Sequence, residues 1–278
     1  MLEIGNYNTL KVLRLTAPGA FLGNAEGDEV LLPNKYVPKN IKVDEEIEVF
    51  VYLDYEERWV ATTLKPYVTM HRFACLEVVD INRGGAFMYW GLEKDLFVPF
   101  QEQVSKMRVG QSYLVYMYLD KSSGRLAATE RINRYLKNEE LTVEENEEVN
   151  LIIANKTDLG FNVVINEKHL GLVYFDDIYI DITTGDKIKG YIKKIRDDHK
   201  IDVTLRPIGY RNIIEPSSQL ILDKIIKKGG VLHLTDNSHP DEIKAILGMS
   251  KKNFKKTIGL LYKQKLIVIK EDGIYLNA

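Results

Sequence analysis

The tripeptide Gly19-Ala20-Phe21 occurs again as Gly85-Ala86-Phe87, 66 residues further along the chain. The same spacing relates other stretches without a gap: Leu32-Pro33 with Val98-Pro99, Tyr52-Leu53-Asp54 with Tyr118-Leu119-Asp120, and Thr63 with Thr129. A third, more diverged copy follows after a further 75 residues, with Gly160 on Gly85, Leu172-Val173-Tyr174 on Phe97-Val98-Pro99, Gly185 on Gly110 and Thr204 on Thr129. A period this short indicates an array of small, similar domains. We therefore expect the function to come from a surface that the array presents.

Within each repeat, apolar residues alternate with polar ones in short runs, which is the pattern of half-buried strands. Residues 46–52 form one such run, and residues 187–192 are its counterpart in the third repeat. About five short strands per repeat can close into a small Greek-key barrel, and the oligonucleotide-binding (OB) fold is the common five-stranded solution. The glycine before the aromatic residue fits this fold, because a curled strand needs a residue without a side chain where it bends.

Beyond residue 207 the apolar period changes from two to about 3.6, which indicates helices. The expected helices are residues 219–226, with an N-cap from Ser217-Ser218; residues 241–247, begun by Ser238 and Pro240 and ended by Gly248; and a third, capped by Ser250, that runs to about Lys263. Two apolar runs then flank Asp272-Gly273, a dipeptide that favours a tight hairpin turn. Helices followed by a hairpin predict a winged helix.

The net charge of −2 hides an uneven distribution along the chain. Residues 1–66 and 139–207 carry net charges of −4 and −6, whereas residues 67–138 and 208–278 carry +3 and +5. A surface that binds a polyanion is therefore expected on the second and fourth segments, and on whichever face of the third collects its lysines. The acidic stretch 139–148 indicates a solvated connector.

The sequence carries no sign of a membrane or export segment. Its longest apolar runs, such as residues 151–154, are far shorter than the about 20 residues that span a bilayer. The N-terminus lacks the basic start and apolar stretch of a signal peptide. The single cysteine, Cys75, cannot form an internal disulfide, which fits a reducing compartment. We therefore expect a cytoplasmic protein without membrane association.

The repeats resemble the RNA-binding repeat of ribosomal protein S1, which typically reads Gly-Ala-Phe-Val, then Gly-Leu-Val-His, and ends in Arg-Ile-Ser-Leu-Ser. The third repeat has Gly171-Leu172-Val173-Tyr174, with tyrosine in place of histidine, and a matching last strand over residues 200–205. The first two repeats keep Gly-Ala-Phe but carry Leu-Leu-Pro-Asn and Phe-Val-Pro-Phe in place of Gly-Leu-Val-His. The third has Asn162 where the aromatic stands, with Phe161 adjacent.

Three such barrels followed by a winged helix resemble the conserved virulence factor B family of bacterial RNA-binding regulators over the whole chain. Pattern and resemblance agree on a mainly β fold with a C-terminal α+β part. The expected domains are three tandem S1-like OB-fold barrels at residues 1–66, 67–137 and 147–207, then a winged-helix domain at residues 213–278. The resemblance also implies single-stranded RNA as the partner and regulation of gene expression after transcription.

Aromatic side chains on such a barrel can stack on bases, and cations around them can neutralise phosphates. The candidate RNA contacts are the aromatics Phe161, Tyr174 and Phe87 and the basic residues Lys168, Lys193, Lys194, Arg196, Lys200, Arg206 and Arg125. Lys200 and Arg125 match the family's arginine at the start of the last strand. Each residue has a simpler alternative, because an aromatic beside a bend often only fills the barrel and a single lysine is often only solvated.

A second candidate surface lies on the third predicted helix. Lys251, Lys252, Lys255 and Lys256 fall on its adjacent turns, with Phe254 and Ile258 on the opposite side. Lysines without acidic partners four residues on indicate a phosphate-binding face. A solvated helix surface and a protein-docking winged helix are the alternatives.

Signals of catalysis are missing from the sequence. The five histidines lie far apart, and it has no Cys-x-x-Cys, His-Glu-x-x-His or phosphate loop. We therefore expect no enzyme activity, no metal and no cofactor. The leading hypothesis is a protein that grips single-stranded RNA through the third barrel and the winged helix, with modest sequence preference. A DNA-binding transcription regulator and a protein-interaction scaffold are the alternatives.

Overall fold

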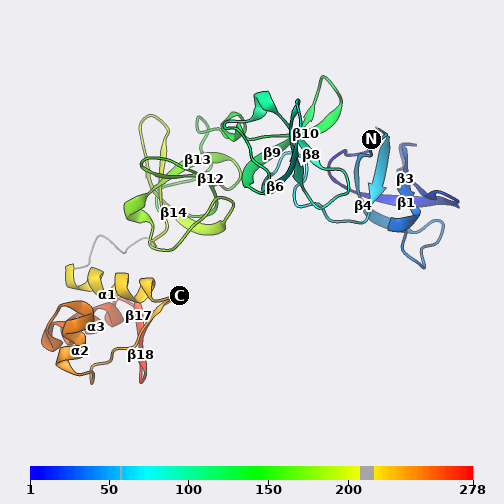
Figure 1. Cartoon of the computed structure of the whole chain (residues 1–278). Coiled ribbons are helices and arrows are strands. Elements are labelled where there is room, and N and C mark those ends of the chain that lie inside the picture. The colour runs from blue at the N-terminus through cyan, green and yellow to red at the C-terminus, as the bar shows by residue number, and fades with distance from the viewer. Residues whose placement is uncertain (57, 207–215, 278) are drawn as a thin grey trace. The chain divides into compact units, whose positions relative to one another are not determined.

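The computed structural model describes residues 1–56, 58–206 and 216–277, and within them the chain forms three closed five-stranded barrels followed by a helical domain (Figure 1). The predicted fold class is confirmed. Barrel 1 consists of β1 (Tyr7–Thr16), β2 (Gly19–Gly23), β3 (Glu29–Pro33), β4 (Glu46–Leu53) and β5 (Trp59–Thr62). Barrel 2 consists of β6 (Phe73–Ile81), β7 (Gly85–Tyr89), β8 (Leu96–Pro99), β9 (Ser112–Asp120) and β10 (Arg125–Thr129). Barrel 3 consists of β11 (Glu148–Lys156), β12 (Gly160–Ile165), β13 (His169–Tyr174), β14 (Lys187–Ile195) and β15 (Ile201–Thr204).

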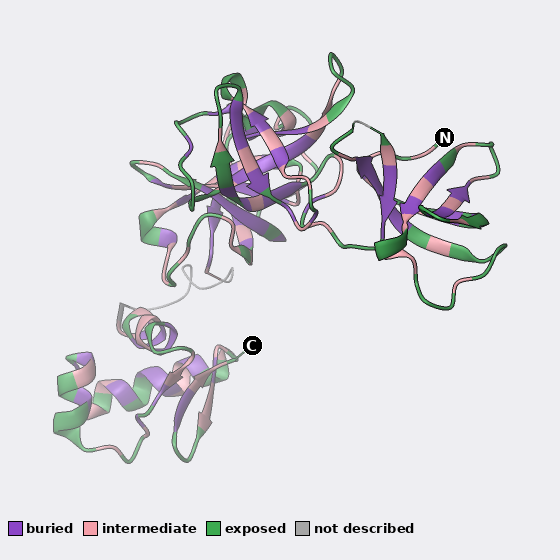
Figure 2. Ribbon diagram, turned by 45° about the vertical axis from the view of Figure 1, so that its right-hand side comes forward, coloured by how far each residue is buried: buried purple, intermediate pink, exposed green. Residues whose placement is uncertain are grey.

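The three barrels share one topology, which is that of the OB fold. In each, the strands are ordered first, second, third, fifth, fourth around the barrel, and the third pairs with the fifth in parallel. A single turn of 3-10 helix follows each third strand: η1 (Asn34–Tyr36), η2 (Phe100–Glu102) and η4 (Phe175–Asp177). A further one, η3 (Ile132–Tyr135), follows the last strand of barrel 2. Figure 2 shows that buried residues are concentrated on the strands of the barrels.

The glycine that opens the repeated tripeptide is required by a close approach between strands. A Cβ on Gly85 would lie 2.2 Å from the carbonyl oxygen of Val98, and one on Gly160 would lie 1.9 Å from that of Val173. A little further along, the first strand of each barrel carries a register shift, as between Val78 and Asp80 of β6, which pair with Met88 and Phe87. A bulge of this kind bends the strand and re-aims the side chains beside it.

Residues 1–137 form one compact unit and residues 138–278 a second. In the first unit barrels 1 and 2 share a core, because Phe50 and Tyr52 of β4 are buried against Trp90 of barrel 2. Their ring centroids lie 5.7 and 6.4 Å from that of Trp90, both edge to face. The N–H of Met70 also donates to the carbonyl of Gly5, with N and O 2.7 Å apart. These contacts hold the two barrels together as one packed body.

The winged helix contains α1 (Pro216–Lys227), β16 (Val231–Leu232), α2 (Pro240–Leu247), α3 (Lys251–Lys263), β17 (Ile267–Lys270) and β18 (Gly273–Leu276). Gly248 ends α2 in the left-handed conformation, and the Ser250 side chain caps α3 by accepting from the N–H of Asn253, as expected. The expected cap of the first helix is wrong, since Ser217 and Ser218 lie inside α1. The N-cap of α2 is His239.

Candidate nucleic-acid interface

The face of an OB barrel formed by its second and third strands is where oligonucleotides bind, so the paired residues on these strands are compared first. In barrel 1 this pair is Phe21 with Leu31, in barrel 2 it is Phe87 with Phe97, and in barrel 3 it is Asn162 with Leu172. The three faces therefore differ at the position where an aromatic ring could stack on a base.

The aromatic ring of barrel 1 is covered by the barrel's own side chains. The guanidinium carbon of Arg14 lies 4.1 Å from the ring centroid of Phe21. Arg14 is fixed there by two hydrogen bonds to the Glu29 carboxylate, of 3.1 and 2.7 Å. This ion pair holds the pKa of Glu29 below its usual value. The face of barrel 1 is closed by an internal salt bridge.

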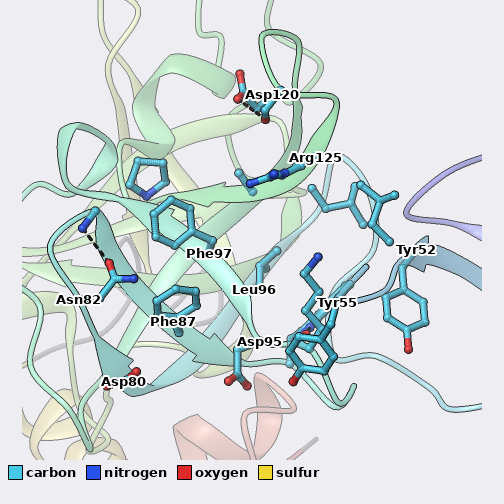
Figure 3. Close-up of a pocket in the computed structure, with 18 of the residues that line it drawn as sticks. Tyr52, Tyr55, Asp80, Asn82, Phe87, Asp95, Leu96, Phe97, Asp120 and Arg125 are labelled. Atoms are coloured by element: carbon cyan, nitrogen blue, oxygen red, sulfur yellow. Dashed lines mark hydrogen bonds between the residues drawn. The ribbon is translucent and has the colours of Figure 1, made fainter. Parts of the chain in front are cut away.

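The corresponding face of barrel 2 is open and forms a groove of about 940 Å³ (Figure 3). The half-buried rings of Phe87 and Phe97 lie side by side in it, with centroids 5.1 Å apart and planes inclined by 43°. Arg125, at the start of β10, is exposed and also lines the groove. Two of the predicted contact residues, Phe87 and Arg125, thus lie in one groove.

Barrel 1 supplies one wall of this groove through its β4–β5 turn. Tyr55, at the tip of the turn, is 70% exposed, and its hydroxyl donates to the carbonyl of Glu93 with O and O 2.5 Å apart. The ammonium group of Lys94 donates to the carbonyl of Asp54 over 2.6 Å, and Lys35 pairs with Glu93. The turn is therefore tied to the loop between β7 and β8, and Figure 3 shows Tyr55 lining the groove beside Asp95 and Leu96.

Two carboxylates, Asp80 and Asp95, lie at one end of the groove, next to Phe87 in Figure 3. Burial, and after it the charge of Asp80, raise the pKa of Asp95 above its usual value. Asp120 and Arg125 lie at the other end, beyond Phe97. The hydroxyls of Ser123 and Ser122 donate to Asp120 and lower its pKa. The groove is thus acidic at one end and mixed in charge at the other.

Barrel 3 carries a smaller hollow of about 220 Å³ on its outer face. Tyr174 lines it from the end of β13, half-buried, together with Asn162 and Leu172. The Arg196 guanidinium donates to the Tyr174 hydroxyl and lies 6.0 Å from its ring centroid. Lys200, at the rim, is exposed. Tyr174, Arg196 and Lys200, all predicted contacts, are therefore brought together.

Most of the predicted cations of barrel 3 are engaged in ion pairs. Lys193 pairs with the buried Asp177 over 2.6 Å, and Lys200 pairs with Asp198 over 2.7 Å. Arg196 pairs with Asp202 over 2.9 Å, which, through the hydrogen bond first and the charge second, raises the pKa of Arg196. The remaining two predicted lysines of this barrel, Lys168 and Lys194, are exposed to solvent.

The other two predicted contacts of barrel 3 serve packing. Phe161 packs against the barrel core, and its ring meets that of Phe175 edge to face at 6.2 Å. Arg206 pairs with Asp223 of α1 over 3.0 Å, and its side chain is only 16% exposed. Neither side chain lines the hollow beside Tyr174.

The lysines of α3 lie on the outer side of the helix, while Phe254 and Ile258 are buried beneath it. Lys252, Lys255 and Lys256 are exposed, and Lys251 is half-buried with its ammonium group donating to the carbonyl of Ser238 over 2.9 Å. An acidic partner comes from outside the helix, since the Lys255 nitrogen lies 3.7 Å from an Asp236 oxygen. The face remains predominantly basic.

Comparison with known proteins identifies both domain types and the arrangement of the whole chain. A family model described as the CvfB-like winged helix domain matches residues 219–276, and a model of the S1 domain matches residues 4–64. Conserved virulence factor B of Staphylococcus epidermidis is 25% identical, over 99% of this chain and 95% of its own. An uncharacterized protein of Bacillus subtilis, YitL, is 26% identical, over 97% of this chain and 92% of its own. Over its whole length the chain is thus similar to members of the conserved virulence factor B family.

A solved structure from Streptococcus pneumoniae, described as a multidomain protein with nucleic acid binding domains, matches with 22% identity over 98% of both chains and a TM-score of 0.43. The matched domain types are those of nucleic-acid-binding proteins. No helix within the described ranges is both long and apolar enough to cross a membrane. Among the same residues, no three His, Cys, Asp or Glu side chains gather as a metal-binding group.

Several residues of the groove were missed by sequence reasoning. Phe97 belongs to Phe-Val-Pro-Phe, which was interpreted only as a departure from the S1 motif. Asp80 and Asp95 could have been found, because the 66-residue spacing places them on Arg14 and Glu29. Tyr55 gave no signal, because its position in the groove depends on how barrels 1 and 2 pack together.

Proposed function

We propose that this chain is a cytoplasmic RNA-binding protein that grips single-stranded RNA through barrel 3 and the winged helix and regulates gene expression after transcription. The observation that carries the proposal is the hollow of barrel 3, where the Tyr174 ring lies beside the Arg196 guanidinium with Lys200 at the rim. An aromatic ring stacks on a base whatever its identity, while the cations neutralise the adjoining phosphates. Such a surface binds single strands with modest sequence preference.

The outer side of α3 supports the same function. Lys252, Lys255 and Lys256 are exposed residues on adjacent turns of this helix. Cations spaced along a helix contact successive phosphates and release the counterions bound there. This surface adds affinity without sequence information, and it complements the stacking surface of barrel 3.

The same lysines favour one rival function, the binding of duplex DNA. A winged helix can place its third helix in the major groove, where base edges are read. The N-terminal half of α3, however, offers chiefly lysines, and Asn253, the side chain suited to adenine, donates to the Ser217 hydroxyl. A helix so equipped is better matched to phosphates than to base edges.

Competition against labelled RNA by single-stranded DNA and by duplex DNA of the same sequence, at two salt concentrations, tests the proposal. We expect RNA to compete best and all affinities to fall with salt. Preferential competition by duplex DNA would transfer the function to the DNA-binding rival. Failure of all three to bind would favour a protein-interaction scaffold.

A further inference from the structure

The groove of barrel 2 has the size and lining of a site for a nucleobase. Its volume of about 940 Å³ exceeds that of the barrel 3 hollow about fourfold, and it lies within the range of small-molecule sites. Phe87 and Phe97 provide a continuous aromatic surface, and Tyr55 of barrel 1 lines the side formed by the neighbouring barrel. A base that enters would have rings beside it from both barrels.

Comparison of repeat positions indicates what kind of base the groove accepts. Asp80 and Asp95 stand 66 residues after Arg14 and Glu29, and Asp80 pairs with Phe87 across the strands as Arg14 pairs with Phe21. In barrel 1 these two positions form the salt bridge that covers the ring. In barrel 2 both positions are aspartates. They cannot form a salt bridge over the Phe87 ring, and the charge of Asp80 acts on the Asp95 carboxylate.

A pair of neighbouring carboxylates favours a ligand that brings hydrogen-bond donors. Ionised carboxylates only accept hydrogen bonds, and a single carboxylate can accept two in parallel. No hydrogen bond reaches the Asp95 carboxylate from the residues that the structure describes, and its raised pKa reflects burial and the charge of Asp80. A donor that bonded to Asp95 would offset both costs.

Among the RNA bases, guanine has two adjacent donors on its Watson–Crick edge, N1–H and the N2 amino group. Adenine and cytosine each present one amino group there, and uracil one ring N–H. We propose that the groove of barrel 2, walled by Tyr55 of barrel 1, is a site for an unpaired guanine of single-stranded RNA, stacked on Phe87 and Phe97 with its Watson–Crick edge donating to Asp95. This inference rests on the proposed RNA binding and adds a sequence preference to it.

The two ends of the groove give the bound nucleotide a direction. The carboxylates lie beside Phe87, and Arg125 lies beyond Phe97 at the other end (Figure 3). A base edge turned toward Asp95 points the sugar and phosphate away from the carboxylates, toward the end where Arg125 lies. The acidic end thus recognises the base, and the basic side chain contacts the backbone.

The test uses the full chain and fluorescent oligouridine with one central residue that is guanosine, inosine or adenosine. Inosine lacks only the N2 amino group of guanosine. The guanosine oligomer is expected to bind about 10-fold more tightly than the adenosine oligomer, with inosine between them, which is the discrimination of one bidentate base contact. Asp95→Asn, which keeps the size of the side chain, should reduce this ratio to near one. Tyr55→Ala should weaken binding of the guanosine oligomer about 5- to 10-fold.

Two matched variants serve as controls. Asp120→Asn also removes a carboxylate from the groove, but one that Ser122 and Ser123 already satisfy, so the guanosine preference should persist. Tyr67→Ala removes a similarly exposed tyrosine of the same unit that does not line the groove, and should leave affinity unchanged. The guanine site is overturned if the wild-type chain binds the three oligomers equally, or if folded Asp95→Asn keeps the full guanosine preference. Either result leaves the proposed salt-dependent RNA binding in place. Absence of binding to every oligomer removes the proposed function as well.

Discussion

At the scale of single residues, Asp95 occupies an unfavourable electrostatic environment in the free protein. Its carboxylate is half-buried and lies near the charge of Asp80, which together raise its pKa. A carboxyl whose pKa is raised on folding costs stability wherever it is ionised in the folded state, and costs nothing below the pKa of the unfolded chain. A residue retained at such a cost is a candidate for function rather than for packing.

Asp95→Asn is therefore expected to stabilise the chain at neutral pH. Relief of the burial cost, and after it of the repulsion from Asp80, is worth on the order of 0.2–1 kcal/mol. The gain should shrink as pH falls through the raised pKa and should vanish below about 3.9, where the unfolded aspartate is protonated too. Urea unfolding at pH 7 and at pH 3 measures it.

Asp120→Asn is the control with the opposite sign, because hydrogen bonds from Ser123 and Ser122 lower the pKa of Asp120. This substitution should destabilise the chain at pH 7 and lose its effect as pH falls below the ordinary range of an aspartate. Equal effects of the two substitutions on the stability at pH 7 would show that Asp95 is not electrostatically unfavourable.

Tyr174 tests stacking on barrel 3. Tyr174→Ala should weaken RNA binding about 10-fold while the salt dependence stays the same, because stacking releases no counterions. Tyr174→Phe keeps the ring but removes the hydroxyl that accepts from Arg196, and should retain most of the affinity. A loss as large in Tyr174→Phe would assign the effect to the position of Arg196.

The limits of residue-level prediction are visible at Phe161. Its neighbour Asn162 takes the position of Phe87, so Phe161 falls on the other side of β12 and packs against the core. Since successive side chains of a strand point to opposite faces, an adjacent aromatic cannot replace the lost one. The tripeptide alignment contained this information. Ion pairs such as Lys193–Asp177 could not be foreseen, because they join residues from different strands and turns.

At the scale of elements, the barrels and α3 followed from local pattern. Alternation placed β4 and β14 within a few residues, and Ser250 and Gly248 marked helix ends through capping that depends only on neighbouring backbone. The start of α1 was misplaced, because two serines resemble a cap although Ser218 is buried within the helix. Local signals locate ends only where tertiary packing does not compete with them.

The lysine face of α3 gives the prediction for an element. Replacement of Lys251, Lys252, Lys255 and Lys256 by alanine should weaken binding about equally across RNA sequences. Each lost phosphate contact should lower the salt slope, which is the slope of log affinity against log salt concentration, by roughly 0.7. The double variant Lys39→Ala/Lys42→Ala, in the acidic first segment, should change neither the RNA affinity nor its salt slope. If the quadruple variant keeps its helical circular dichroism and its original salt slope, the face is only solvated and the winged helix is better interpreted as a docking module.

At the scale of the whole molecule, the order of the domains was readable from the sequence, but the groove was not. Repeats specify each barrel separately, whereas the groove arises because Phe50 and Tyr52 of one barrel are buried against Trp90 of the next. Barrel 1, whose own face is closed by Arg14, contributes instead through Tyr55. A repeat that has a closed binding face can still form part of its neighbour's site.

The two compact units allow phosphate contacts and base recognition to be separated by a cut after Lys137. Asn138 must stay with the second unit, because its side chain donates to the carbonyls of Leu170 and His199 over 2.8 and 3.0 Å. The fragment 138–278 should keep most of the RNA affinity and its salt dependence, since it contains the α3 lysines and Tyr174. The fragment 1–137 should bind weakly and with a shallow salt slope, yet retain the guanosine preference of the groove. Fluorescence anisotropy with the three oligouridine probes measures both properties, and comparable affinity of the fragments, or a guanosine preference carried by 138–278, would reverse this division.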